Sequence, residues 1–298
     1  MIQFFNLTIR NIKIFFKDKG MFFASMITPI ILLVLYATFL SNVYADSFKS
    51  MMPDGVIVND KLINGIVSGQ LFSSLMAVCC ITVAFSSNIV MANDRLSGAR
   101  KDILITPVKK SVLALSYFVS TFITTFIVTF IAFCACLIYV AIKGWYLSAG
   151  DVISLLCDVI LLTFFGTSFS SLVNEFLYTQ GQISAVSAIV SAGYGFICGA
   201  YMPISSFSEG LKKVLMFLPG TYGTSLLRNH CLAGVFRQME EDNFPSMIID
   251  GLRDSIDCNI YFFDTNVKII TMYMVLISAI IILTFAYVLI NSLDKKRS

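Results

Sequence analysis

Two long runs without a charged residue constrain this chain more than any other feature of its sequence. One covers residues 62–93 and the other covers residues 111–142. Each exceeds the roughly 20 apolar residues that a helix needs to cross a bilayer, at a rise of about 1.5 Å per residue. Five Lys and Arg residues lie between them, within residues 92–110. The pattern predicts two membrane-spanning helices joined by a short charged loop at one membrane face.

The composition of the whole chain agrees with a membrane protein. Of 298 residues, 57% are hydrophobic and 13% are charged, and the mean hydropathy is +0.83. A soluble domain has about 25% charged residues. We therefore predict an all-α membrane protein with a single transmembrane domain over residues 1–298 and six transmembrane helices, near residues 21–40, 66–90, 112–140, 152–173, 183–201 and 269–291.

The segment before the first predicted span has the pattern of an interfacial helix. Ile2, Phe5 and Ile9 recur at three- and four-residue spacing, and Arg10 and Lys13 belong to a cationic stripe beside them. Apolar and cationic stripes side by side suit a helix that lies in the membrane interface. We predict such an amphipathic helix over residues 1–19, with a cleaved signal peptide as the competing interpretation.

Between the last two predicted spans the chain is broken into short pieces. Residues 207–217 and 221–233 are each too short to cross a bilayer, and Pro219-Gly220 separates them. Two re-entrant half-helices are predicted here, and a surface amphipathic hairpin is the alternative. The net acidic residues that follow are predicted to be a solvated face, so that residues 202–268 form an extracellular re-entrant and acidic segment.

The distribution of basic residues predicts the orientation. The predicted cytoplasmic segments carry twelve Lys and Arg residues, whereas the two short outer loops, one with a turn at Pro53-Asp54-Gly55, carry three. By the positive-inside rule both termini and the loop over residues 91–111 are cytoplasmic. The loop over residues 174–181, which carries Glu175 and no Lys or Arg, is cytoplasmic by parity. The tail Asp294-Lys295-Lys296-Arg297 follows the last span on the same side.

Few motifs of soluble enzymes occur. One histidine excludes an HExxH zinc motif, and neither a GxxxxGK[ST] phosphate loop nor a GxSxG elbow is present. We therefore predict no catalytic residue, no metal and no cofactor bound by this chain. A net charge of +3 is too small to suggest a nucleic-acid partner. Cys231 and Cys258 lie in the predicted outer segment, where two free thiols and a disulfide both stay open.

Asp158 is an ionisable residue inside the fourth predicted span. Such a group is costly in the membrane and marks a functional site by default. Because Asp158 lies about two turns from the outer end of the span, it could instead reach water or the hydroxyl of a neighbouring residue. A structural role and a role in a substrate path are both retained. The single histidine, His230, is predicted to be a solvated loop residue.

The charged loop also carries a family resemblance. Asp94-Arg95-x-x-Gly98, followed by residues 103–108 (ILITPV), is similar to the acidic-Arg-x-x-Gly…Leu-Leu-x-Thr-Pro-Val stretch of type-2 ATP-binding-cassette (ABC) export permeases. Lys101 departs from the acidic residue that is common there, and Asp102 follows it. In that family the stretch docks on the ATPase subunit. The resemblance implies that residues 91–111 are the coupling loop, with contacts from Asp94, Arg95, Gly98, Arg100, Asp102, Thr106 and Pro107.

Elementary chemistry suits that role for the loop. Gly98 lets the backbone turn or approach another surface, and Thr106-Pro107 ends one helix or starts the next. The charged side chains offer charge-assisted contacts to a soluble partner. The alternative is a solvated loop whose cations only set the topology.

A second resemblance follows the fifth predicted span. Cys198-Gly199-x-x-Met202-Pro203, then Leu218-Pro219-x-x-Tyr222 and Arg228, is similar to the Ser-Gly-x-x-Phe-Pro…Pro-x-x-Tyr…Arg block of the same family. There the block forms short helices that dip into the outer leaflet and close the exit. The resemblance implies an outer gate built by Gly199, Pro203, Pro219, Gly220 and Tyr222.

Together these features predict the permease subunit of an ABC exporter in a bacterial plasma membrane. It would move an amphipathic substrate (a drug, an antibiotic peptide or a lipid-like molecule) outward. The resemblance implies two copies of a separate ATPase subunit, which bind the ATP and Mg, and a homodimer or a heterodimer with a related permease. The alternatives are an ion-coupled secondary transporter and a non-transporting membrane sensor or assembly factor.

Overall fold

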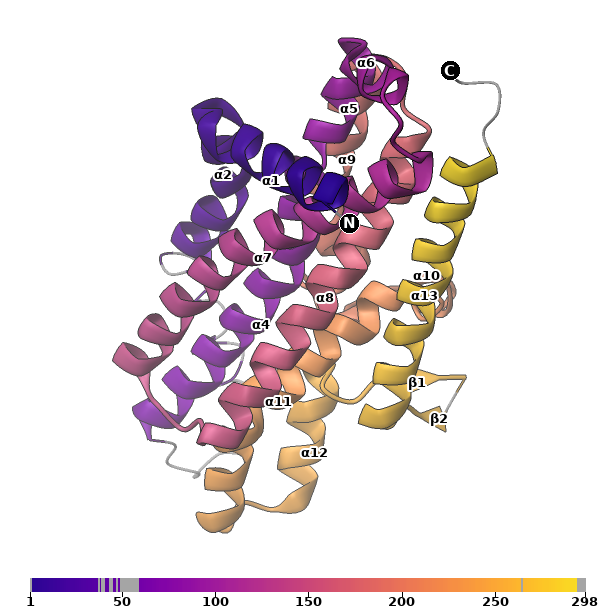
Figure 1. Cartoon of the computed structure of the whole chain (residues 1–298). Helices are drawn as coiled ribbons and strands as arrows, with labels where there is room; N and C mark the ends of the chain where they lie inside the picture. The colour runs from indigo at the N-terminus through magenta and orange to yellow at the C-terminus, as the bar shows by residue number, and fades with distance from the viewer. Residues whose placement is uncertain are drawn as a thin grey trace.

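The computed structural model describes residues 2–36, 38, 41, 42, 45, 46, 48, 59–263 and 265–293, and most of them are helical. Figure 1 shows long helices running side by side between two ends of the molecule. In chain order the helices are α1 (Ile2–Lys17), α2 (Lys19–Leu35), α4 (Asp60–Ser87), α5 (Ile89–Leu96), α6 (Ala99–Ile105), α7 (Lys110–Lys143), α8 (Ala149–Glu175), α9 (Gln180–Ile197), α10 (Glu209–Leu215), α11 (Pro219–Glu241), α12 (Ser246–Ser255) and α13 (Ile269–Leu293).

The two ends of this bundle differ. One end carries α5 and α6, and we call it the coupling end. The other carries α12 and a short antiparallel hairpin of β1 (Tyr261–Phe262) and β2 (Thr265–Asn266), and we call it the hairpin end (Figure 1). The hairpin is the only strand pair among the described residues, and it is a small departure from the all-α prediction.

Four helices of the described chain are long and apolar enough to cross a membrane: Asp60–Leu96, Lys110–Lys143, Ala149–Glu175 and Ile269–Ser292. The α1–α2 pair, bent by 74°, makes a fifth candidate if it is taken as one span. Helix α9, which covers most of the predicted span at residues 183–201, does not meet the same test, because its Gln, Gly and Ser residues lower its hydropathy. The chain is thus an all-helical, multi-pass membrane protein with four to five candidate spans.

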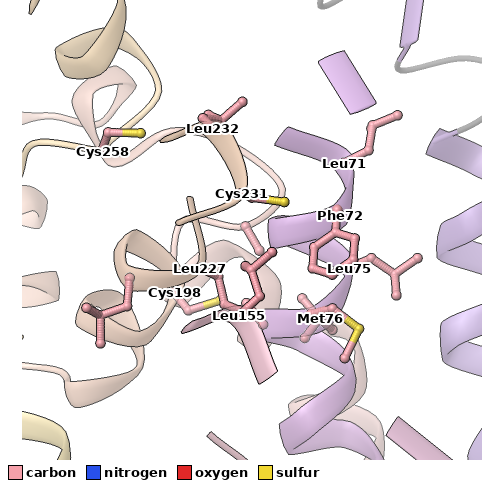
Figure 2. Close-up of a cluster of buried hydrophobic side chains, with 14 of the residues drawn as sticks. Leu71, Phe72, Leu75, Met76, Leu155, Cys198, Leu227, Cys231, Leu232 and Cys258 are labelled. Carbon is pink, nitrogen blue, oxygen red and sulfur yellow. The ribbon is translucent and has the colours of Figure 1, made fainter. Parts of the chain in front are cut away.

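Helix α4 forms the centre of the fold. Nearly all of its side chains are buried, and it packs against α2, α7, α8, α9 and α11. A helix that is hydrophobic around its whole circumference is expected to be buried in this way. Figure 2 shows how Leu71, Phe72, Leu75 and Met76 of α4 lie near Leu155 of α8 and near Leu227 and Cys231 of α11.

Small residues bring these helices close together. A Cβ atom on Gly69 of α4 would lie 2.6 Å from Leu232 Cδ2 of α11, and one on Gly166 of α8 would lie 2.5 Å from the Cys80 carbonyl oxygen of α4. At Gly166 the obstacle is a backbone atom, so glycine is required there, whereas a side chain at Gly69 would push the Leu232 side chain aside.

The two half-helices predicted between residues 207 and 233 take a different form. The first is α10, a helix of 7 residues, but the second is α11, which has 23 residues and is largely buried. Pro219 occupies the first turn of α11, where its missing N–H costs nothing, so it starts a long helix and does not separate two short ones. The short second half-helix and the surface hairpin were therefore both wrong.

Some predicted features lie outside the described residues. They are the Pro53-Asp54-Gly55 turn, the end of the first predicted span and the basic tail after the last span. The amphipathic helix predicted over residues 1–19 is present as α1, and its position in the membrane interface stays a prediction. The bend after it follows Asp18, whose carboxylate accepts a hydrogen bond from the Met21 N–H at 3.1 Å and caps α2.

Candidate coupling site and outer gate

The charged loop folds into two short helices with a glycine turn between them. Gly98 has a φ of +84°, in the left-handed region that favours glycine, and it precedes α6. Thr106 is extended and ends α6, where its backbone N–H donates to the Ile103 carbonyl, and Pro107 then leads toward α7. The turn and the helix boundary predicted from Gly98 and Thr106-Pro107 are both present.

Two arginines of this loop bind the ends of α8 and α13. Arg95 donates through Nη1 to two carbonyl groups at the C-terminal end of α8 and to the Leu177 carbonyl just after it, at 2.9–3.0 Å, and through Nη2 to Glu175 Oε2 at 2.7 Å. Arg100 donates to Glu175 Oε1 at 3.2 Å and to Asn291 Oδ1 of α13 at 2.7 Å. Cations are favoured at a helix C-terminus, where carbonyl groups lack partners inside the helix. The Glu175 side chain is only 2% exposed, so it is the buried centre of this network.

Asp94 connects the same loop to α1 and α7. Its carboxylate accepts hydrogen bonds from Arg10 Nη1 and Nη2 at 2.5 and 3.0 Å and from the Tyr117 hydroxyl at 2.6 Å. Asp94 is buried, and Arg10 lies on α1. The loop is therefore joined to four other helices through charge-assisted hydrogen bonds.

These contacts add partners that the sequence analysis did not name. Asp94, Arg95 and Arg100 bind groups of the same chain, and their predicted contacts with an ATPase subunit stay a prediction. Sequence reasoning missed Arg10, Glu175 and Asn291 as their partners. The one available signal was Glu175, an acidic residue in a short loop that has no basic residue to balance it.

The surface that remains at the coupling end is partly apolar. Asp102, Thr106 and Pro107 are exposed there. Ile105 is 84% exposed and Leu96 is 39% exposed. Two aromatic side chains in the loop after α8, Phe176 and Tyr178, are also exposed, and the Arg95 guanidinium lies 5.6 Å from the Tyr178 ring centroid.

At the other predicted site, Gly199 is tied to a buried arginine. Arg228 of α11 is 1% exposed and donates to the Gly199 carbonyl oxygen and, at 3.0 Å, to Asp257 Oδ2. Asp257 also accepts the backbone N–H groups of Ile204 at 2.6 Å and Ser205 at 3.2 Å, directly after Pro203. Gly199 has a φ of +74°, so the chain turns there in a conformation that favours glycine.

The remaining predicted gate residues lie together at the start of α11. The Tyr222 hydroxyl donates to the Met216 carbonyl oxygen at 2.6 Å, which joins α11 to the end of α10. Gly220 faces Tyr194 of α9 so closely that a Cβ atom there would clash with the Tyr194 hydroxyl. Tyr222 therefore links α11 to α10, Gly220 lets α11 approach α9 closely, and the Arg228 network holds Gly199 and the residues directly after Pro203.

Asp158 is buried, and both of its carboxylate oxygens have partners. Oδ1 accepts the Tyr273 hydroxyl of α13 at 2.5 Å, and Oδ2 lies 2.6 Å from Nδ1 of His230 on α11. Contact with a neighbour's hydroxyl was one of the two interpretations of Asp158. The prediction for His230 was wrong, because its side chain is 18% exposed and lies on a helix beside Asp158.

The structure decides between free thiols and a disulfide for the two cysteines of the predicted outer segment. Cys231 and Cys258 are both free thiols, and both are buried. Among the described residues, no group of three or more His, Cys, Asp and Glu side chains is placed to hold a metal ion.

The sequence was compared with known proteins. A family model described as ABC-2 family transporter protein matches residues 57–293, which include both the Gly98 loop and the Arg228 network. The chain belongs to the ABC-2 transporter family. An ABC-2 protein of this kind is the permease subunit of an ABC transporter: a membrane transport component that associates with an ABC ATPase and typically has no ATPase site of its own. No protein of curated function matches this sequence.

Proposed function

We propose that this ABC-2 permease is the membrane subunit of an exporter, which moves an amphipathic substrate outward with energy from ATP hydrolysed on a separate ATPase subunit. The observation that carries the proposal is the coupling end, where an exposed apolar surface around Ile105 lies on a loop bonded to four other helices. ATP and Mg would bind to the ATPase, and this chain would contribute no catalytic residue.

The hydrogen bonds of the loop would transmit a movement of α6 to other helices. A push on α6 would reach α8 and α13 through Glu175 and Asn291, and it would reach α1 through Asp94 and Arg10. Charge-assisted hydrogen bonds to a buried carboxylate are costly to break, so the connected helix ends would move with the loop. We propose that this movement opens the path for the substrate.

The assembly follows from the same proposal. Helix α9 would be the fifth of six spans, with the α1–α2 pair supplying an interfacial helix and the first span. Ala185, Ile189, Ala192 and Phe196 lie on one exposed side of α9. The two alanines would allow close helix contact, and the two large apolar side chains would pack against the partner. That side would face a second permease, in a homodimer or a heterodimer, and two ATPase subunits would dock below the pair.

The topology and the gate complete the proposal. Both termini would lie in the cytoplasm of a bacterium, so that the hairpin end faces outward. There α10 and the start of α11 would enter the outer leaflet, and the Gly199, Pro203, Pro219, Gly220 and Tyr222 contacts would keep the exit closed until the spans move. Asp158 would stabilise the helices beside this gate.

A single substitution at the coupling surface tests the docking part of the proposal. Ile105→Glu places a charge in the proposed interface without touching the internal network, because Ile105 is 84% exposed. We expect the affinity for the ATPase to fall at least tenfold, about 1.4 kcal/mol, since a charge at the centre of an interface must be desolvated. The measurement is the ATPase bound to the purified permease over a concentration series.

Met247→Glu is the matched control. Met247 is also 84% exposed, but it lies on α12 at the hairpin end. Its substitution should leave ATPase binding and ATP-driven transport unchanged. Equal ATPase binding by Ile105→Glu and the wild type would show that α6 is not the docking element.

A further inference from the structure

Two acid–base pairs join α8 to α11 at a regular spacing. Asp151 lies beside Arg237, and Asp158 lies beside His230. The acids are seven residues apart on α8, and the bases are seven residues apart on α11. Seven residues are about two turns, so each set occupies one side of its helix, and the opposite order of the pairs means that the helices are antiparallel. We call these four residues the acid–base ladder.

The two pairs of the ladder differ in burial and in chemistry. The Arg237 side chain is 49% exposed and keeps its charge at every physiological pH. The deeper pair contains Asp158, whose side chain is 1% exposed, and His230, whose type of side chain ordinarily gains or loses a proton near neutral pH. The Tyr273 hydroxyl fixes the second oxygen of Asp158 and brings α13 into the same cluster.

The charged surroundings of His230 favour its protonated form. From α8, Asp158, Asp151 and Cys157 face this region, and from α13 Tyr273 does. Helix α4 carries no charged residue between residues 62 and 87. Arg237 is paired with Asp151, and Arg253 of α12 lies over the Phe236 ring near the outer turns of α11. Burial lowers the pKa of the His230 imidazole, but the hydrogen bond and charge of Asp158 outweigh it, so this pKa lies above its ordinary value.

A proton is the ligand that this cluster can accept without losing a contact. Neutral imidazole already donates its Nδ1–H to Asp158 in one tautomer, and protonation at Nε2 then adds a positive charge beside the carboxylate. We propose that Asp158, His230 and Tyr273 form a proton-binding site that fastens α11 to α8 and α13, so that the pH at the hairpin end regulates the permease. The effect on transport rests on the proposed export function, whereas proton binding does not.

The direction of the effect follows from linkage. A histidine whose pKa is raised by folding adds stability that is complete below its ordinary pKa of about 6.5 and is lost as the pH rises through its value in the folded protein. The junction of α8, α11 and α13 is therefore tightest in acid and looser in mild alkali. Since α11 begins at the proposed gate, loosening it would ease the opening of the exit.

The first experiment uses the fact that the chain has a single histidine. The full-length protein, purified with a tag that contains no histidine and labelled with ¹³C in the imidazole ring, gives one ring signal to follow by NMR. We expect its midpoint above 6.5 in the wild type and at a lower pH in Asp158→Asn, which keeps the shape of the side chain and removes its charge. An equal midpoint in the two proteins would overturn the proposal.

The second experiment measures thermal unfolding of the same proteins from acid to mild alkali. The midpoint temperature of the wild type should fall as the pH rises through the His230 titration, and His230→Gln should remove that dependence. Arg237→Gln is the control, because it breaks the pair nearer the surface and should leave the dependence on pH in place. A wild-type curve that matches the His230→Gln curve would contradict the proposed site.

The regulatory part needs a third measurement. Vesicles that contain the permease and its ATPase should transport a fluorescent amphipathic dye at a rate that changes with pH at the hairpin end in the wild type but not in His230→Gln. If the NMR signal titrates as expected while the transport rate does not change with pH, the proposed regulation by pH is wrong. If neither protein transports at all while the titration holds, the export function is wrong and the proton site stands.

Discussion

At the scale of single residues, Glu175 is the carboxylate that pairs with two arginines at the coupling end, Arg95 and Arg100. Glu175 is buried, whereas most ion pairs of proteins lie on the surface and contribute little to stability. Removing one partner of a buried pair leaves an uncompensated charge, which typically costs about 3–5 kcal/mol.

Glu175→Gln should therefore lower the thermal unfolding midpoint of the permease markedly, because both arginines lose their carboxylate. Glu209→Gln provides the matched control, since Glu209 is paired with Lys212 but is 80% exposed and should be neutral to within about 0.5 kcal/mol. The comparison is made by thermal unfolding in one detergent. Similar midpoints for the two variants would mean that the Glu175 network contributes no stability.

At the scale of helices, close packing depends on a few glycines. Gly166→Ala should loosen the contact of α8 with α4, because the new methyl group would lie 2.5 Å from the Cys80 carbonyl oxygen. We expect a loss of about 1–3 kcal/mol from overpacking. Gly193→Ala on α9 is the control, since no atom lies within 4 Å of the added Cβ, and it should be neutral or slightly stabilising. Thermal unfolding of both variants checks the difference.

Several features of these elements follow from the sequence, because they depend on neighbouring residues. The Gly98 turn and the Thr106-Pro107 boundary are local, and so is the amphipathic pattern of α1. The partners of Asp94 and Arg95 are not local: Arg10 is 84 residues away and Glu175 is 80 residues away, and no spacing rule links such positions.

The histidine was misplaced for a related reason. With Pro219 taken as a break, residues 221–233 seemed too short for a continuous helix, and His230 fell near its end. In the structure α11 continues to Glu241, and only then does the seven-residue spacing of His230 and Arg237 match that of Asp151 and Asp158. The match between two helices becomes visible only once both are known to be continuous and adjacent.

At the scale of the whole molecule, the outer surface of the bundle fits a lipid environment. Helix α13 has large apolar side chains that point outward, including Ile270 at 75%, Ile282 at 65% and Phe285 at 67% exposure. Charged side chains that are buried instead form ion pairs, at the coupling end, beside Arg228 and beside His230. This separation agrees with a multi-pass membrane protein whose two polar ends lie in water.

The orientation can be tested by labelling single cysteines in intact cells. Of the eight natural cysteines, only Cys157 is exposed in the structure, so the Cys157→Ser variant should show little labelling of its own. A cysteine at Asp242 should react with an impermeant thiol reagent from outside, and one at Lys109 should react only after the cells are opened. Equal labelling at Lys109 in intact cells would reverse the proposed orientation.

The acid–base ladder also limits how the length of this chain can change. An α-helix turns by about 100° per residue, so one residue inserted between His230 and Arg237 would carry one of the two bases away from α8. The same holds between Asp151 and Asp158. Single insertions and deletions should therefore be harmful within these two stretches, whereas the turn after Glu241 can gain or lose residues without moving either pair. The length of two stretches of eight residues, 151–158 and 230–237, is thus fixed, because the two pairs of the ladder set how α8 and α11 are aligned along each other.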